Sequence, residues 1–322
     1  MNKLTIDNIE TTITDFKPNL KPSSVKQYLC QSKKLYELFG EKDFMFLNDP
    51  ESVQNKVAGN SSSNNVKNKL NACIVILQSV NERKELIADY IKRRDDLEAE
   101  YVKQQETGIK SKKQQENMCT VAELKTMLNT MKSDIRKSKV RQKDNLTWMD
   151  RELGMVYTIF SILVDFPIRN DMAGMRLVNK TTLKKMDDNY NYLLNENGSF
   201  SMIINDYKTN KTKEKQGEDK TNIIPLNKEI DKVIRSHLRL FNIKNGDYMF
   251  INKSSEPYTR NAISNLLLRY SKKYLNKNIS TCMIRHIVPS DRFGETNKEQ
   301  KALAKVMMHS VATNIGVYVK HD

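Results

Sequence analysis

The sequence predicts a mainly α-helical protein of two domains with one small β element. Over most of the chain, apolar residues recur at intervals of three and four, which is typical of helices that bury one face. The pattern changes to short extended runs only around residues 199–226. The length of 322 residues favours two domains, and a chain of this size can bury a core without disulfides or metal.

The first hundred residues have the pattern of a helical bundle. Ser23 or Ser24 can cap a helix that ends at Gly40, and Pro50 can open another one. Helices are expected at residues 23–40, 50–56, 66–80 and 86–101, with a loop of Gly, Ser and Asn at residues 59–65. We therefore predict a helical domain at residues 1–105.

Residues 106–117 are predicted to be a linker. The stretch from residue 103 to residue 117 has almost no apolar side chains, so it has no face to bury. A solvated helix is the alternative, because only Gly108 interrupts the stretch. The second domain then occupies residues 118–322.

This second domain combines helices with one extended element. Thr120 and Glu123 have the spacing of a capping box before the first helix. Helices are expected at residues 121–135, 148–164, 181–196, 229–241, 259–274 and 298–308. Residues 199–204 and 221–226 are expected to pair as a β-hairpin around a long polar loop.

The net charge of +15 favours a polyanionic partner, because Lys and Arg side chains bind phosphates and release counterions. Solubility alone is the plainer explanation of this charge. An anionic membrane is a further possible partner, but the sequence shows no strongly amphipathic basic helix that would bind one. The sequence has no apolar run long enough to span a membrane and no secretory signal at its start. Its four cysteines are scattered, which indicates free thiols in a reducing, intracellular compartment.

Several kinds of chemistry are disfavoured by the sequence. It contains neither the phosphate-binding pattern GxxxxGK[ST] nor the zinc pattern HExxH, and it has only four histidines. The carboxylate pairs Asp95-Asp96 and Asp187-Asp188 lie in polar stretches predicted to be helical, where a solvated face is the simpler interpretation than a two-metal site. We therefore expect no metal and no other cofactor.

Five residues remain as candidates for chemistry on a polyanion. They are Arg169 after an apolar helix, Lys208 in the predicted hairpin loop, Arg285, His309, and Tyr318 nine residues after His309. Each one alone has an ordinary structural explanation, such as a charge at a helix end, an ion pair or a buried histidine. Three other tyrosines are rival hydroxyl groups: Tyr258, Tyr270 and Tyr274. Only the order and spacing of the five make them a candidate site.

In this order and spacing the sequence resembles the tyrosine recombinases, or phage-integrase-type recombinases. That family has an arginine, a hairpin lysine, an H-x-x-R motif, and a tyrosine nine residues after a second histidine. Arg285-His286 matches the central motif, although Cys282 stands where the family usually has histidine, and Met308 replaces the glycine before the second histidine. Lys21-Pro22-Ser23-Ser24-Val25 and Tyr28 resemble the start of the family's N-terminal domain, so the resemblance covers nearly the whole chain.

The resemblance implies a fold and a set of partners. Residues 1–105 would be the family's helical, SAM-like core-binding domain, and residues 118–322 its mixed α/β catalytic domain. The two would grip double-stranded DNA, with a homo-tetramer acting on two DNA sites. Family members commonly continue beyond the tyrosine into a helix that docks on a neighbouring subunit, whereas four residues follow Tyr318 here. We expect either a truncated chain or assembly through another surface.

The resemblance also implies a reaction that needs neither metal nor ATP. The Tyr318 oxygen would attack a DNA phosphorus, with Arg169 and Arg285 stabilising the negative charge of the transition state. Lys208 would protonate the leaving 5′-oxygen, and His309 would hydrogen-bond the phosphate or help to deprotonate the tyrosine. Two alternatives stay open: a type IB topoisomerase that relaxes DNA, and a DNA-binding protein without catalysis. The content of Asn, Lys and Ile hints at an AT-rich source such as a virus or a mobile element.

Overall fold

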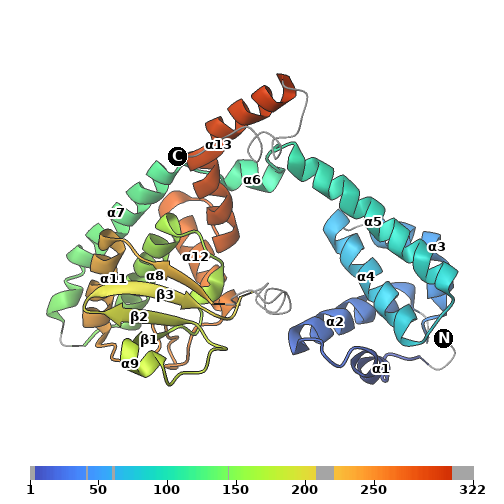
Figure 1. Cartoon of the computed structure of the whole chain (residues 1–322), viewed down its shortest axis with the longest axis horizontal. Helices are drawn as coiled ribbons and strands as arrows, with labels where there is room; N and C mark the ends of the chain where they lie inside the picture. Colours follow the sequence, from blue (N-terminus) through green and yellow to red (C-terminus); the bar gives the residue numbers. More distant parts are fainter. Residues whose placement is uncertain (1–3, 41–42, 60–61, 144, 208–220, 307–322) are drawn as a thin grey trace. The chain divides into compact units, whose positions relative to one another are not determined.

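The computed structural model describes residues 4–40, 43–59, 62–143, 145–207 and 221–306, and the chain divides into two compact units (Figure 1). The first unit spans Met1–Ile109 and the second Lys110–Asp322. Three of the predicted site residues lie outside the described residues: Lys208, His309 and Tyr318. In the part of the chain that is described, no helix combines the length and apolar character needed to cross a membrane.

The N-terminal unit is built around helix α4. Its helices are α1 (Ile9–Phe16), α2 (Pro22–Phe39), η1 (Met45–Asn48), α3 (Pro50–Ala58), α4 (Ser63–Ser79) and α5 (Lys84–Glu106). Every side chain of residues 72–77 in α4 is buried, so this helix needs neighbours on most of its surface. Helices α1, α2, α3 and α5 supply them (Figure 1). The sequence did not predict α1, which is short and has β-branched side chains at five of its eight positions.

The stretch predicted as a linker is helical on both sides of a break. Helix α5 continues to Glu106, and α6 (Lys112–Asn117) begins after a capping box formed by Ser111 and Gln114. Gly108 has a φ of 67°, a left-handed conformation that glycine adopts without strain. The boundary between the two compact units follows Ile109, directly after this break.

Helix α8 (Trp148–Asp165) is the centre of the C-terminal unit. Eleven of its residues are buried, and α7 (Val121–Lys137), α11 (Lys228–Phe241), α12 (Arg260–Leu275) and α13 (Thr281–Val306) pack around it. Thr147 and Asp150 form a capping box at its start, and Lys143 pairs with the Asp150 carboxylate at 2.8 Å. The C-terminal end of α8 is the point from which the chain enters the candidate site.

A four-stranded sheet completes this unit, in the order β1-β2-β3-β4 (Figure 1). The strands are β1 (Arg176–Asn179), β2 (Tyr192–Glu196), β3 (Ser199–Ile204) and β4 (Asn222–Pro225). Strands β1 and β2 are parallel, and the other two pairings are antiparallel. One face, with Leu193 and Met202, packs into the helical core, and the other face, with Val178 and Ile203, packs against the region of Leu183. The predicted pairing of residues 199–204 with residues 221–226 is confirmed by β3 and β4.

The helix predicted at residues 181–196 is wrong. Only α9 (Lys180–Leu183) is helical, and β2 occupies the end of the segment. Asp187 accepts hydrogen bonds from the backbone and side-chain nitrogens of Asn189, which holds a turn where the helix would continue. Asn197 and Gly198, with φ values of 55° and 90°, then form the tight turn between β2 and β3. This Asn-Gly pair was the hairpin signal that the prediction missed.

Helix α13 is longer than predicted and contains a proline. The sequence predicted a helix only at residues 298–308, of which residues 307 and 308 lie outside the described part, whereas α13 runs from Thr281 to Val306. Pro289 has no amide hydrogen, so it cannot donate to the carbonyl of Arg285 one turn earlier. Buried residues of α13 all precede this proline within the described range: Thr281, Met283, Ile284, Ile287 and Val288.

Gly154 permits the close packing of α8 on α11. A methyl group at this position would lie 2.8 Å from Cζ of Phe241 and 3.4 Å from Cδ2 of Leu240. We expect Gly154→Ala to lower the free energy of unfolding of the C-terminal unit by about 1–3 kcal/mol, because an overpacked core must shift. Urea unfolding followed by the fluorescence of Trp148, the single tryptophan of the chain, measures this change.

Gly294→Ala is the matched control. Gly294 is also helical, but a methyl group there meets no atom within 4 Å, so the better helix propensity of alanine should leave stability equal or slightly higher. Equal stability of the two variants would contradict the proposed close contact.

His237 of α11 is buried as a neutral ring. Its Nε2 lies 2.9 Å from the carbonyl oxygen of Met249, and its Nδ1 lies 3.3 Å from the hydroxyl of Thr158. Burial lowers the pKa of His237 to about 4, although the hydrogen bond to Met249 acts in the opposite direction. Because the unfolded histidine takes up a proton near its ordinary pKa of 6.5, the ring favours the unfolded state at acid pH.

We therefore expect the C-terminal unit to lose about 2 kcal/mol of stability through His237 between about pH 7.5 and about pH 5. The stabilisation is complete above the unfolded pKa and is lost as the pH falls toward the folded value. Trp148 fluorescence in urea at both pH values measures it. His237→Gln should flatten the pH dependence of stability, and substitution of the exposed His286 by Gln should not. An unchanged pH dependence in His237→Gln would show that His237 does not cause it.

Candidate functional site

Arg169 lies where the chain leaves α8. Pro167 cannot continue a helix, and the chain turns into the short η3 helix (Asn170–Met172), for which Arg169 is the residue preceding the first turn. The Arg169 side chain is exposed, whereas Met172 is buried in the core and fixes the turn. The core therefore positions the backbone of Arg169 and leaves its guanidinium group available.

Arg285 lies on the first half of α13. Its neighbours Ile284 and Ile287 are fully buried, so the helix cannot rotate without exposing them. Arg285 itself is exposed, and so is Cys282 one turn earlier on the same face. Cys282, at the position where the family usually has histidine, thus lies beside the second candidate arginine.

Asp171 of η3 carries a carboxyl group on which the charges of both arginines act. Its carboxyl is largely buried, with 9% of the side chain exposed, and Arg260 approaches it to 3.2 Å. Burial raises the pKa of Asp171, while the positive charges of Arg260, Arg169 and Arg285 act in the opposite direction. The structure therefore brings Arg169 and Arg285, which are 116 positions apart in the sequence, within electrostatic reach of one carboxyl group.

Arg260 also binds the end of strand β3. Its Nη2 donates to a side-chain oxygen of Asp206 at 3.0 Å and to the backbone oxygen of the same residue at 2.9 Å. Thr259 caps α12 through the amide of Ala262, which sets Arg260 at the first position of the helix. One guanidinium group thus joins η3, β3 and α12.

Asn191 makes a second connection between the same segments. Its side-chain nitrogen donates to the backbone oxygens of Asp171 and Asp206, and its side-chain oxygen accepts from the amides of Asn205 and Asp206. Asn170 donates to the backbone oxygen of Arg260 and to the hydroxyl of Ser264. These bonds fix the backbone near the arginine cluster (Arg169, Arg260 and Arg285).

The sequence predicted part of this arrangement. The positive charges of Arg169 and Arg285 both act on Asp171, whereas Lys208, His309 and Tyr318 lie outside the described residues, and the catalytic roles of all five remain a prediction. The prediction missed Arg260, Asp171 and Asp206. A signal was present, because one aspartate follows Arg169 by two positions and the other precedes Lys208 by two positions.

The three rival tyrosines are poor nucleophiles. Burial raises the pKa of Tyr258 to about 12, with the negative charge of Glu152 acting in the same direction. Burial and a hydrogen bond to Asp134 raise the pKa of Tyr274 to about 12 as well. Tyr270 donates to the Glu152 carboxylate at 2.9 Å, and its pKa is also raised. Their raised pKa values disfavour the phenolate form relative to an ordinary tyrosine, and the hydroxyls of Tyr270 and Tyr274 are hydrogen-bonded within the fold.

The carboxylate pairs also have structural explanations. Asp187 stabilises the turn before β2, and Asp95 pairs with Arg94 at 2.6 Å on the exposed side of α5. Within the described residues, no three His, Cys, Asp or Glu side chains are grouped closely enough to hold a metal ion.

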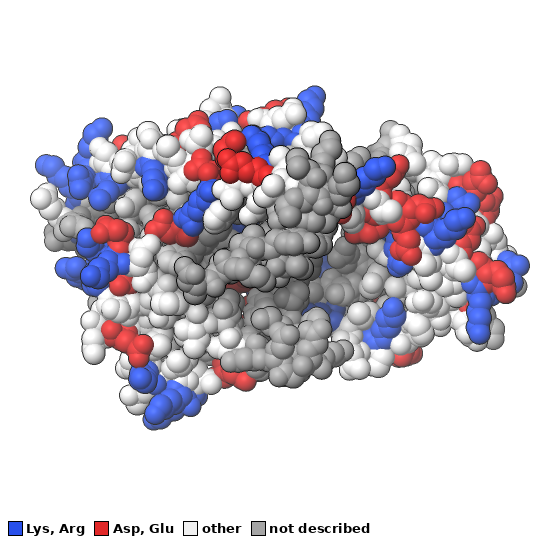
Figure 2. Space-filling view, turned by 45° about the horizontal axis from the view of Figure 1, so that its top comes forward, with Lys and Arg blue, Asp and Glu red and all other residues white. Residues whose placement is uncertain are grey.

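The positive charge is spread over the face that Figure 2 presents. Figure 2 shows Lys and Arg side chains interspersed with Asp and Glu on the face that it presents, without one continuous basic patch among the residues that it colours. Net charge alone therefore does not mark the candidate site, which is defined by the cluster of arginines.

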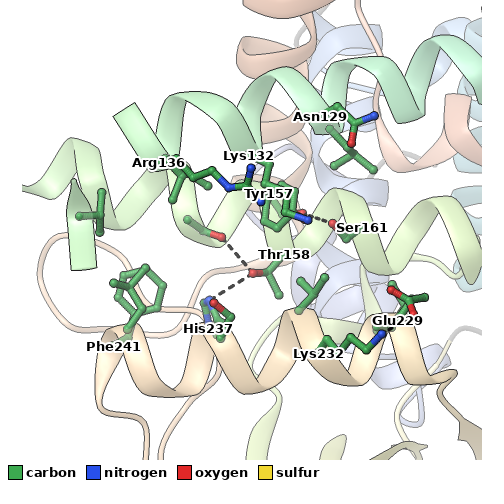
Figure 3. A pocket seen from close by; sticks show the side chains of 18 of the residues that line it. Asn129, Lys132, Arg136, Tyr157, Thr158, Ser161, Glu229, Lys232, His237 and Phe241 are labelled. Atoms are coloured by element: carbon green, nitrogen blue, oxygen red, sulfur yellow. Dashed lines mark hydrogen bonds and ion pairs between the residues drawn. The ribbon is translucent and has the colours of Figure 1, made fainter. Parts of the chain in front are cut away.

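A separate cavity of about 750 Å³ lies among α7, α8 and α11 (Figure 3). Lys132 and Arg136 of α7 lie on one side, and Thr158, Ser161 and His237 contribute polar groups from α8 and α11. None of the three clustered arginines is among its lining residues. This cavity and the candidate site are therefore distinct features of the C-terminal unit.

The comparisons with known proteins rest on structure. No family model and no curated protein matches this sequence. Two crystal structures of a XerH site-specific recombinase match over 100% of this chain and 82% of theirs, each at 14% sequence identity. The post-cleavage complex with a palindromic difH substrate gives a TM-score of 0.53, and the pre-cleavage complex with difH gives 0.50. A XerA recombinase covers 98% of the chain, with a TM-score of only 0.35.

The likeness to XerH extends over both units, and the architecture is mainly helical with a small mixed sheet, as predicted. At 14% identity it shows the fold. The chain therefore has the fold of the tyrosine recombinases.

Proposed function

We propose that this chain cleaves and rejoins double-stranded DNA at specific sites through a covalent 3′-phosphotyrosine at Tyr318. The observation that supports this most is that Arg169 and Arg285, far apart in the sequence, both act electrostatically on one carboxyl group in a protein with the tyrosine recombinase fold. Two exposed arginines whose backbone is positioned by buried neighbours match the needs of a phosphoryl-transfer transition state, in which charge develops on the non-bridging oxygens.

The proposed reaction assigns one role to each predicted residue. The Tyr318 oxygen forms a bond to phosphorus while the bond from phosphorus to the 5′-oxygen breaks. Arg169 and Arg285 bind the non-bridging oxygens, and the Lys208 ammonium group gives its proton to the leaving 5′-oxygen. His309 hydrogen-bonds the phosphate or helps to deprotonate Tyr318. The reverse steps rejoin the strand, so the scheme consumes no ATP and uses no metal.

The proposal extends to the partners of the chain. The XerH structures are complexes with the difH substrate before and after cleavage, and we propose double-stranded DNA as the substrate here as well. Residues 1–105 would form the DNA-binding domain and residues 118–322 the catalytic domain, joined by residues 106–117. A homo-tetramer on two DNA sites is the assembly that strand exchange requires.

Replacement of Tyr318 by Phe is expected to abolish covalent attachment to DNA, because it removes the attacking oxygen. Since the target sequence is not known, the substrate is a library of random duplexes with a nick near the centre. At a suitable site the short strand beyond the nick diffuses away after cleavage and traps the adduct. Adducts that resist detergent are isolated and their DNA is sequenced.

Tyr258→Phe is the matched control and should keep the adduct. An adduct that persists in Tyr318→Phe would show that another group is the nucleophile. DNA binding with no adduct from the unsubstituted chain would support a DNA-binding protein without catalysis. Relaxation of any supercoiled plasmid, with no recombinants from the sequenced site, would support the type IB topoisomerase alternative.

Replacement of Arg169 or Arg285 by Gln is expected to slow adduct formation by roughly 10²–10³-fold, as the loss of one positioned donor does elsewhere. DNA affinity should change little, because many other cations contribute to it. Single-turnover kinetics at saturating DNA measure the rate. Arg239→Gln, an exposed arginine at the end of α11, is the control and should leave the rate unchanged. Equal rates for all three variants would rule out the assigned roles.

A further inference from the structure

The geometry points to Arg260 as a positioning residue of the proposed active site: by pairing with Asp171 and Asp206 it keeps the guanidinium groups of Arg169 and Arg285 available for the scissile phosphate. This inference rests on the proposed function. It assigns a role to a residue that neither the order of motifs nor the spacing of the candidates indicated.

The first support is the position of the ion pairs. Arg260 lies 3.2 Å from Asp171 and 3.0 Å from Asp206, whereas no ion pair within 4.0 Å joins Arg169 or Arg285 to a carboxylate among the described residues. Both of these arginines nevertheless lie close enough to act on the charge of Asp171. Arg260 thus occupies the carboxylates that would otherwise attract the other two.

The second support is the burial of Asp171. With 9% of its side chain exposed, a charged Asp171 without a partner would be costly, and a nearby cation would be drawn to it. Asn191 donates to the backbone oxygen of Asp171, which fixes the segment that carries this carboxyl. In the absence of Arg260, the positive charges of Arg169 and Arg285 would still act on Asp171.

The third support is the charge of the cluster. Three arginines and two aspartates have a formal charge of +1, and without Arg260 the charge would be zero. The Arg260 side chain is 46% exposed, so its ion pairs are screened by water and contribute little to stability. Its two carboxylate partners and its anchoring by Asn170 indicate that its position matters more than its contribution to folding.

Arg260→Gln is expected to slow adduct formation by about 10- to 100-fold at saturating DNA, less than the loss of Arg169 or Arg285 itself. The deciding variant is the double substitution Arg260→Gln with Asp171→Asn. It removes the competing carboxylate together with its partner and restores the charge of +1, so most of the lost rate should return.

The matched double variant joins Arg260→Gln with Asp206→Asn. It restores the same net charge but leaves Asp171 free to attract Arg169 and Arg285, so it should recover less of the rate. Arg260→Lys keeps the charge but not the planar guanidinium group that contacts both aspartates, and its rate should fall between those of the single variant and the unsubstituted chain. Folding of each variant is checked by Trp148 fluorescence in urea, and rates are compared for folded protein.

Two results would overturn the inference. One is an unchanged rate for folded Arg260→Gln, which would leave Arg260 a structural residue only. The other is equal recovery by both double variants, which would mean that net charge alone matters. Failure of the proposed function is recognised separately, because the unsubstituted chain would then form no adduct, or an adduct that does not depend on Tyr318. In that case the role inferred for Arg260 would also be wrong.

Discussion

The burial of helix α8 is the constraint on which the C-terminal unit depends. Because α8 is apolar on nearly all sides, other elements must cover it, and α7, α11, α12 and α13 do so together with one face of the sheet. The close approach at Gly154 leaves little freedom in how α11 is placed. A helix held this firmly gives its C-terminal end a fixed position, and Arg169 follows that end.

The same core then determines which charges meet. Elements from three separate parts of the sequence bring Asp171, Asp206 and Arg260 together, and Arg285 approaches from α13. A buried carboxylate needs a cation, while a phosphate-binding site needs cations without partners. The cluster has one more arginine than it has aspartates, which is the balance that the proposed function would need, and the asparagines at 170 and 191 keep the backbone around it in place.

The sequence was a good guide to the helices and a partial guide to the site. Periodic apolar positions predicted α2, α4, α7, α8, α11 and α12, because burial of one face leaves a regular pattern. Strands β1 and β2 were missed because each is short. The apolar residues of β2 have a spacing that also fits a helix, and the turn that joins β2 to β3 is what makes them a strand. Arg169 and Arg285 could be selected by motif order. Arg260 could not, because its role depends on Asp171 and Asp206, from which it is 89 and 54 positions away. The assignments of Lys208, His309, Tyr318, the tetramer and an AT-rich source remain predictions.

Pro289 divides α13 into two parts that differ in burial. Before the proline, Ile284, Ile287 and Val288 are held in the core, and Arg285 is carried on this part. After it, no described residue with an assigned exposure is buried, so this part adds no buried side chain to the core. The backbone carbonyl of Arg285 lacks its usual helical donor, which weakens the connection between the parts. The core therefore fixes the backbone of Arg285 through the residues before the proline, whereas the part after it is attached through polar contacts: Asp291 accepts from the amide of Val121, and Arg292 donates to the last backbone carbonyls of α8.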